Sequence, residues 1–373
     1  MPNKLRHAVG SLMVVGLAAR ELSGLERAWL QLVRPAGVIL FRRNIECAAQ
    51  TRALLHEATS LCASHSFRCV DMEGGTVDRL RNALAPMPAA QSVALAAQQR
   101  GKSALPREHG ELIARASKAF GFNTTLAPVL DLALPASAGV MGTRAVADTA
   151  EGVIAYARPF LAGLGAHGMA GCAKHFPGLG GGMLDSHLET PTILRTLREL
   201  QSEDMVPYRE LRNDLPMVMV NHAAYPNTPE KKKPASASSY WITTVLRKQL
   251  GYRGIVFSDD LEMGGILKFL PIEEAAIAAI HAGMDMIEIC HSPELILRAY
   301  EALLREAERS AAFRTLITQR ANRLARTRKK LFASGVPAAL STKQLDTLRN
   351  RIQRFSESVE KAQPRVEFAE VTA

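Results

Sequence analysis

Short apolar segments recur along the chain, and each is followed by a segment whose apolar positions follow helical spacing. Continuous apolar strands of this kind are typical of a parallel sheet that is covered on both faces. The strand-like segments span residues 9–15, 37–41, 67–72, 124–130, 169–173, 217–220, 254–257 and 284–289. The helix-like segments span residues 21–33, 46–64, 106–120, 149–164, 192–213, 238–250, 272–282 and 293–308.

Eight strand–helix units in series predict an α/β fold, a closed (β/α)₈ barrel of the TIM type. A doubly wound open sheet is the alternative, but no predicted strand is followed by a G-x-G-x-x-G motif. We expect one barrel domain over residues 1–333, including a further helix that follows residue 307. A basic helical extension and a loose tail occupy residues 334–373, with a helix at 341–363. This extension is too short to form a second domain.

The first apolar segment has two interpretations. Lys4 and Arg6 precede an apolar run at residues 8–19, which loosely resembles a short signal sequence. However, the run contains two glycines, lacks a clear cleavage site and continues into an amphipathic segment. The sequence therefore favours a first core strand.

Composition and charge narrow the class of protein. The content is 47% hydrophobic and 22% charged residues, which is ordinary for a globular domain. The net charge of +10 comes mostly from residues after 300, where acidic residues are interspersed and aromatic residues are few. This pattern favours a solvated basic face over a nucleic-acid site, although it could also attract an anionic substrate.

The cysteines and the hydropathy indicate the compartment. Five cysteines show no metal-like spacing, and no apolar run is long enough to span a membrane. We therefore expect a cytoplasmic protein with reduced thiols, no cofactor, no metal and no nucleic-acid or membrane partner.

Reactive residues cluster where the predicted strands end. In a (β/α)₈ barrel the chemistry lies at the carboxyl ends of the strands, which form one face. The polar residues at these positions are Asp71, Glu73, Asp131, Lys174, His175, Asn221, His222, Asp259, Asp260, Glu288 and His291. The sequence therefore predicts a polar site at this face, with His222 as a residue of the pocket wall or of the packing behind it, and Glu288 and His291 as structural or rim residues.

Residues 173–187 combine a strand end, a glycine-rich loop and the tripeptide Asp185-Ser186-His187. If the tripeptide is extended, Asp185 and His187 share a face, and the carboxylate raises the pKa of the imidazole toward a value suited to a proton donor. A flexible surface loop with an incidental Asp and His is the alternative.

Asp259 and Asp260 follow the apolar strand at 254–257. One carboxylate can act as a nucleophile while its neighbour caps the turn. With a separate proton donor such as His187, Asp259 would complete the two groups of a retaining glycosidase. A turn stabilised by both carboxylates, with no catalytic part, is the alternative.

Several motifs together resemble glycoside hydrolase family 3, and within it the β-N-acetylhexosaminidase (NagZ-type) branch. They are GVILFRRN at 37–44, VDMEGGTVDR at 70–79, APVLD at 127–131, GTR at 142–144, KHFPG at 174–178, DSH at 185–187 and SDDLEM at 258–263. The motifs occur in the family's order and spacing, over about residues 9–331, so together they are much more specific than any one alone.

The resemblance implies a role for each matching position. Asp259 would be the nucleophile, and His187, paired with Asp185, the general acid/base. The residues that would bind the sugar hydroxyls and the 2-acetamido group are Asp71, Arg79, Arg144, Lys174 and His175.

The implied activity is the release of terminal β-linked N-acetylglucosamine. The substrate would be a muropeptide from peptidoglycan recycling, or a chitooligosaccharide. Two alternatives remain open: a phosphorylase that uses the same residues, and a sugar-binding barrel without catalysis. Whether the chain is a monomer or a dimer is open as well.

The chain departs from the family pattern at three places. The usual Gly-His-Gly-Asp reads Gly178-Leu179-Gly180-Gly181, the Arg after Glu-Gly-Gly is Thr76, and the Ser-Phe pair after Arg144 reads Ala145-Val146. These changes put the rigidity of the loop, the choice of aglycone and the substrate range in question.

Overall fold

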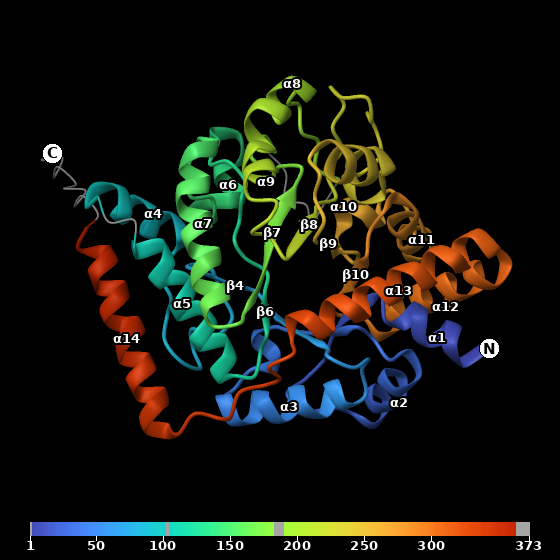
Figure 1. The fold of residues 1–373 in the computed structure, drawn as a ribbon, viewed down its shortest axis with the longest axis horizontal. Coiled ribbons are helices and arrows are strands. Elements are labelled where there is room, and N and C mark those ends of the chain that lie inside the picture. Colours follow the sequence, from blue (N-terminus) through green and yellow to red (C-terminus); the bar gives the residue numbers. More distant parts are fainter. Residues whose placement is uncertain (1, 102–103, 183–189, 363–373) are drawn as a thin grey trace, which may run out of the picture.

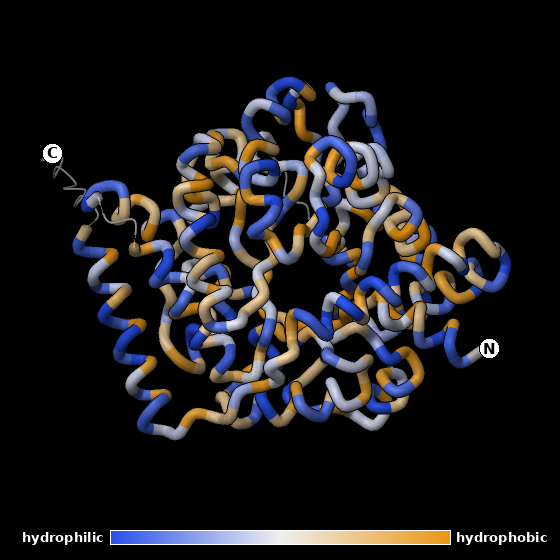
Figure 2. The backbone as a smooth tube through the Cα atoms, viewed as in Figure 1, coloured by the Kyte–Doolittle hydropathy of each residue, from blue (hydrophilic) through white to orange (hydrophobic). Residues whose placement is uncertain are grey.

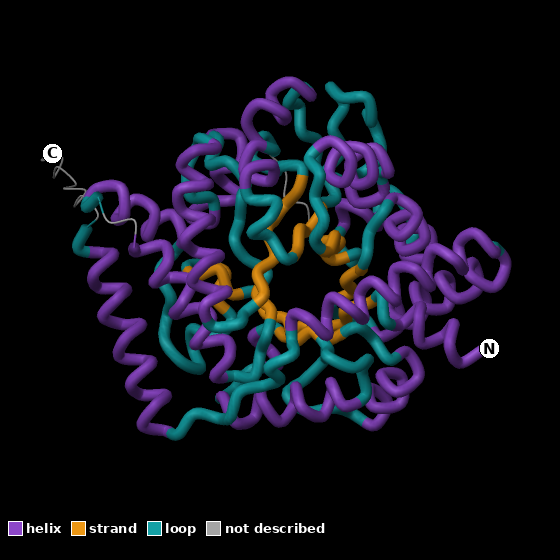
Figure 3. Tube along the Cα trace, in the orientation of Figure 1, coloured by secondary structure: helices purple, strands orange, loops and turns teal. Residues whose placement is uncertain are grey.

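The computed structural model describes residues 2–101, 104–182 and 190–362. Within these residues, eight parallel strands close into a barrel in the order β1-β10-β9-β8-β7-β6-β3-β2. The strands form a ring at the centre of Figure 3, with helices around it. The predicted (β/α)₈ fold is confirmed.

The barrel strands are short and buried. Each strand pairs in parallel with its two neighbours, for example with Met217 opposite Ile255 and Val14 opposite Gly37, and the register shifts within two of the pairs. The strands are β1 (Met13–Gly16), β2 (Gly37–Leu40), β3 (Phe67–Val70), β6 (Thr124–Thr125), β7 (Ala170–Phe176), β8 (Met217–Val220), β9 (Ile255–Asp260) and β10 (Met286–Ile289). A small antiparallel pair, β4 (Met72–Gly74) and β5 (Val77–Asp78), follows β3.

Helices cover the outside of the barrel (Figure 1). They are α1 (Pro2–Gly10), α2 (Gly24–Val33), α3 (Ala48–Ser60), α4 (Ala90–Gln99), α5 (Ala104–Ala119), α6 (Ala138–Met141), α7 (Ala150–Ala166), α8 (Leu197–Glu199), α9 (Val206–Glu210), α10 (Gly264–Leu267), α11 (Ile272–Ala282), α12 (Pro293–Arg309), α13 (Ala311–Leu331) and α14 (Thr342–Glu360). Short 3₁₀ segments are η1 (Arg42–Asn44), η2 (Pro135–Ser137), η3 (Gly142–Arg144) and η5 (Ala235–Ala237), and π-helical segments are η4 (Leu200–Asp204) and the longer η6 (Tyr240–Gln249). None of the described helices is long and apolar enough to cross a membrane.

The prediction of a strand at residues 9–15 was wrong in its first part. Residues 2–10 form helix α1, and β1 begins at Met13. Val9 is buried, and α1 packs against helices α12 and α13 while the preceding residues are largely exposed. One apolar face satisfies the same hydrophobic pattern as a strand start, and periodicity over so short a run does not separate the two.

Other strand boundaries differ from the prediction as well, for example those of the fourth and fifth barrel strands. The predicted strand at 124–130 pairs over Thr124–Thr125, and an isolated bridge joins Val129 to Lys174 further on. Strand β7 continues to Phe176, beyond its predicted end at residue 173, and its register with β8 shifts between Ala173 and Phe176.

The C-terminal helices pack on the barrel's outer layer. Helix α14 contacts α4 and α5, and its buried face includes Phe355, whose ring stacks on that of His109 at 5.9 Å between centroids. Figure 2 shows hydrophilic and hydrophobic positions alternating along this outer helix. The helix predicted at 341–363 is confirmed, whereas the division into residues 1–333 and 334–373 stays a prediction. The predicted tail at 364–373 lies outside the described residues.

Candidate active site

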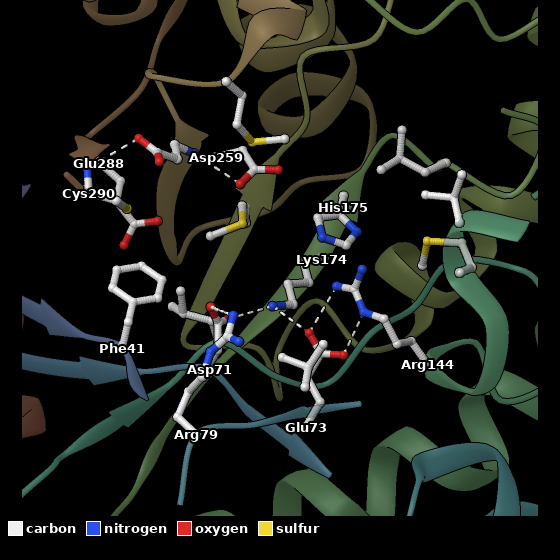
Figure 4. Close-up of a pocket in the computed structure, with 18 of the residues that line it drawn as sticks. Phe41, Asp71, Glu73, Arg79, Arg144, Lys174, His175, Asp259, Glu288 and Cys290 are labelled. Carbon is white, nitrogen blue, oxygen red and sulfur yellow. Dashed lines mark hydrogen bonds and ion pairs between the residues drawn. The ribbon is translucent and has the colours of Figure 1, made fainter. Parts of the chain in front are cut away.

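A pocket opens at the carboxyl ends of the strands, as a (β/α)₈ fold requires for chemistry. Its volume is about 210 Å³. Figure 4 shows Asp71, Glu73, Lys174, His175, Asp259 and Glu288 directed into it from different strand ends. Its walls come from residues far apart in the sequence: Phe41, Asp71, Glu73, Val77, Arg79, Leu126, Val140, Met141, Arg144, Lys174, His175, Leu179, Met219, Asp259, Asp260, Met263, Glu288, Cys290 and His291.

One wall of the pocket is a charge network. Lys174 Nζ lies 2.9 Å from Asp71 Oδ1 and 2.7 Å from Glu73 Oε1. Arg144 donates from Nε and Nη2 to both oxygens of Glu73, at 2.8 and 2.9 Å. Arg79 completes the network with a 3.3 Å contact to Asp71 Oδ2. Paired, hydrogen-bonded charges are the form in which buried ions are tolerated.

The network keeps its members ionised. Burial alone would raise the pKa of Asp71 and Glu73, but the cations outweigh it and hold both pKa values well below their ordinary range. Burial likewise opposes the charge of Lys174, and its carboxylate partners still raise its pKa. Fixed charges of both signs therefore face the pocket at neutral pH.

His175 is oriented by Asp131. Asp131 Oδ2 lies 2.6 Å from His175 Nδ1 and also accepts the His175 backbone N–H at 3.2 Å. Asp131 Oδ1 accepts the N–H of Leu179 at 2.7 Å. This buried carboxylate therefore fixes the imidazole and the start of the glycine-rich loop at the same time.

Asp259 and Asp260 end strand β9 and serve different purposes. Asp259 lines the pocket, and its Oδ1 accepts the backbone N–H of Asp260 at 2.9 Å. Asp260 Oδ1 accepts the N–H groups of Glu262 and Cys290 at 3.0 and 3.2 Å. Asp260 also borders the pocket, but it stabilises the turn, as the sequence indicated for one of the pair, whereas Asp259, among the described residues, makes no contact of this kind with the following turn.

His222 lies behind the pocket rather than among the residues that line it. Its Nδ1 is 2.7 Å from Ser236 Oγ, and its Nε2 is 3.0 Å from the carbonyl oxygen of Asp260. Burial lowers the pKa of this histidine, with opposition from Asp259. It supports the backbone of the strand end that carries Asp259. Asp185 and His187 lie outside the described residues.

Several pocket residues were not assigned to the site from the sequence. Glu73 was noted at a strand end but given no role, although it is two residues from Asp71 and could have been expected beside it. Glu288 and His291, interpreted as structural or rim residues, both line the pocket. Phe41 carried no polar signal, and it stacks on the His291 ring at 5.3 Å between centroids.

One cluster has donor atoms of the kinds that bind metals. Oxygens of Asp260 and Glu262 and a nitrogen of His291 lie within 4.8 Å of one another. However, Glu262 already accepts the N–H groups of Cys290 and Ser292, at 2.9 and 2.7 Å, and Asp260 shares the N–H of Cys290 and accepts that of Glu262. These hydrogen bonds stabilise the turns that follow strands β9 and β10, and they account for the positions of the clustered side chains.

Comparison with known proteins identifies the family. The model of the glycosyl hydrolase family 3 N-terminal domain matches residues 4–327. The chain belongs to glycosyl hydrolase family 3. It is therefore a glycoside hydrolase, and the resemblance seen in the motifs is confirmed.

Two relatives of this family 3 chain are both β-hexosaminidases. A β-hexosaminidase of Alkalilimnicola ehrlichii is 41% identical over 292 residues, 77% of this chain and 82% of the relative. A β-hexosaminidase of Xanthomonas campestris pv. campestris is 36% identical over 310 residues, 82% of this chain and 92% of the relative.

Solved structures of the family share the fold. A family 3 β-N-acetylglucosaminidase from a Paenibacillus species superposes with a TM-score of 0.84 at 31% identity, covering 94% of this chain and 68% of that one. NagZ from Neisseria gonorrhoeae in complex with N-trifluoroacetyl-D-glucosamine superposes with a TM-score of 0.71 at 31% identity, covering 85% of this chain and 98% of that one.

Proposed function

We propose that the protein is a retaining, exo-acting β-N-acetylglucosaminidase that releases terminal β-linked N-acetylglucosamine. The observation that carries the proposal is the position of Asp259, on the wall of a pocket that also contains the Asp71–Glu73–Lys174 network. The β-hexosaminidase relatives and the sugar-bound NagZ support the choice of sugar. The volume of about 210 Å³ supports exo action, because it is below the roughly 300–1,000 Å³ of drug-sized sites and suits one sugar unit.

In the proposed mechanism Asp259 attacks the anomeric carbon and forms a covalent glycosyl-enzyme. His187, paired with Asp185, protonates the leaving oxygen and then removes a proton from the attacking water, so the configuration is retained after two displacements. Asp71, Arg79, Arg144, Lys174 and His175 bind the hydroxyls and the 2-acetamido group. Charged donors and acceptors that are already fixed favour a sugar that satisfies them and reject one that leaves them unpaired.

The natural substrate belongs to the same proposal. Muropeptides from peptidoglycan recycling carry terminal N-acetylglucosamine, and chitooligosaccharides are the second source of this end group. A cytoplasmic site of action is part of the proposal for muropeptides. His222 acts through the backbone of Asp260 rather than on the sugar.

Release of nitrophenol from its β-N-acetylglucosaminide and its β-glucoside, with and without phosphate, tests the proposal. We expect hydrolysis of the acetamido sugar, no dependence on phosphate, and a first product of β configuration by proton NMR. Asp259→Asn should lower kcat by at least about 10³-fold, as expected for loss of a nucleophile. A rate that rises with phosphate would indicate a phosphorylase, and binding of the sugar without turnover by the folded parent would indicate a sugar-binding barrel.

A further inference from the structure

Glu288 is a buried carboxyl group that the proposed mechanism does not use. It belongs to β10, is 2% exposed and lines the pocket. Its backbone is fully engaged, since its N–H donates to Ser258 Oγ at 3.0 Å and its carbonyl oxygen accepts the N–H of Leu261 at 2.9 Å. In contrast, its side-chain Oε1 is buried and has no hydrogen-bond partner among the described residues.

Such an atom requires an explanation. An unsatisfied buried polar group costs about 1–3 kcal/mol, so unpaired groups in native structures are rare. A leucine of similar size would avoid this cost at a wall of the barrel. A polar group without a protein partner at the edge of a ligand pocket is accounted for if the ligand is its partner.

The surroundings of Glu288 decide its protonation state. Burial raises its pKa well above the ordinary value, and the neighbouring carboxylates Asp260, Asp71 and Asp259 raise it further. Lys174 opposes this shift, but its ammonium is already paired with Asp71 and Glu73. A neutral carboxylic acid carries one O–H donor, which the carboxylates around it lack.

We propose that Glu288 is a further substrate-binding residue, whose carboxylic acid donates a hydrogen bond to a hydroxyl of the bound sugar. In Figure 4, Glu288 approaches the pocket from the side of Phe41 and Cys290, across from the Lys174 network. A sugar hydroxyl has one proton and two lone pairs. A hydroxyl that gives its proton to a pocket carboxylate such as Asp71 keeps its lone pairs free, and the O–H of Glu288 satisfies one of them.

This inference rests on the proposed sugar site. A measurement of sugar binding tests it separately from the proposed catalytic activity. The probe is N-acetylglucosamine, with its Kd measured by calorimetry for the parent, Glu288→Gln and Glu288→Leu at pH 7. The Gln variant keeps a neutral donor, so we expect a Kd within about threefold of the parent. The Leu variant removes the donor, and we expect binding about tenfold weaker, the loss typical of one buried hydrogen bond. KM should follow Kd, with kcat changed less.

Two further readouts separate hydrogen bonding from packing. With deoxy analogues of N-acetylglucosamine, the analogue that lacks the contacted hydroxyl should bind the parent and Glu288→Leu equally. Raising the pH should weaken binding to the parent once Glu288 ionises, more than it weakens binding to Glu288→Gln.

Equal Kd values for the parent and Glu288→Leu would overturn the inference, as would equal losses in the Gln and Leu variants. If Glu288→Leu does not fold, Glu288→Met provides the same test, because its flexible side chain fills the space without a donor. Failure of the parent to hydrolyse the glycoside while it still binds the sugar would remove the proposed function and leave the role of Glu288 testable.

Discussion

The carboxyl groups on the two walls of the pocket differ in whether a cation lies beside them. On the wall built by β3, β4 and β7, each carboxylate has a cation within hydrogen-bonding distance, as in the pairs of Lys174 with Asp71 and Glu73. On the wall built by β9 and β10, Asp259 and Glu288 form no ion pair with a Lys or Arg among the described residues.

The difference shows how one small pocket can combine binding with chemistry. Paired carboxylates hold their charge and geometry, so they suit recognition of hydroxyls. A carboxylate without a cation keeps its lone pairs available for attack on carbon, since a bound cation would stabilise the charge and lower its reactivity. A carboxyl among other carboxyls stays protonated and becomes a donor. In the proposed site, the same functional group therefore takes three roles, depending on its neighbours.

Removing the anion from the first wall should have the largest effect on stability. Glu73→Gln leaves the buried Lys174 and the half-buried Arg144 with Asp71 as the remaining carboxylate of the network. Breaking a buried pair in this way costs about 3–5 kcal/mol of unfolding free energy. Urea denaturation measures the loss. Glu273→Gln, which breaks the exposed pair with Arg298, is the control and should leave stability nearly unchanged. Similar stabilities of the two variants would contradict the distinction.

On the same wall, Asp131→Asn tests whether the orientation of His175 matters to the reaction. The amide replaces a charged acceptor beside His175 Nδ1, so the imidazole loses its fixed orientation. We expect kcat/KM for the acetamido glycoside to fall by about 10- to 100-fold, the scale of a misplaced binding group. An unchanged kcat/KM in a folded variant would show that the orientation of His175 does not matter to the reaction.

On the wall built by β9 and β10, we expect Glu288→Gln to be more stable than the parent by an amount that depends on pH. The native state keeps a proton that the unfolded chain releases near the ordinary value of 4.5. Because the native state then binds more protons, the stability contributed at this site falls as the pH rises from 4.5 toward the native pKa. The Gln variant does not lose stability in this way. The free energy of unfolding of the variant, relative to that of the parent, should therefore rise by up to about 1.4 kcal/mol per pH unit.

Unfolding by urea at pH 4.5, 6 and 7.5 measures this difference. If the difference in unfolding free energy between Glu288→Gln and the parent is constant with pH, Glu288 has the same pKa in the native and unfolded states. Glu46→Gln, at an exposed ion pair with Arg20, provides a control for carboxylate removal away from the pocket.

The smallest effect is expected at the pocket rim. The hydrogen bond with Asp260 raises the pKa of His291 above its ordinary value of 6.5, although burial opposes it. The stabilisation from this charge is therefore complete below pH 6.5 and disappears as the pH rises through the native pKa. Proton NMR of the His291 ring should show a pKa above that of a histidine in the unfolded chain. A value at or below 6.5 would contradict the interaction.

The barrel and the placement of the site could be predicted from the sequence because both depend on local patterns. Alternating apolar segments specify strands and helices, and a parallel barrel brings every carboxyl end to one face. This reasoning located Asp71, Lys174 and Asp259 at one pocket. It failed at residues 9–12, where one apolar face fits a helix or a strand equally well, and it gave Glu73 no role.

What the sequence determined by itself was the family, the order of elements and the set of polar strand ends, since these are written in spacing and residue type. Only the tertiary structure decided which carboxyl groups received cations. Lys174 reaches two carboxylates more than a hundred residues away, whereas Glu288, at an equivalent strand end, reaches none of the described cations. Charge state depends on burial and on neighbours in space, and closure of the barrel creates both.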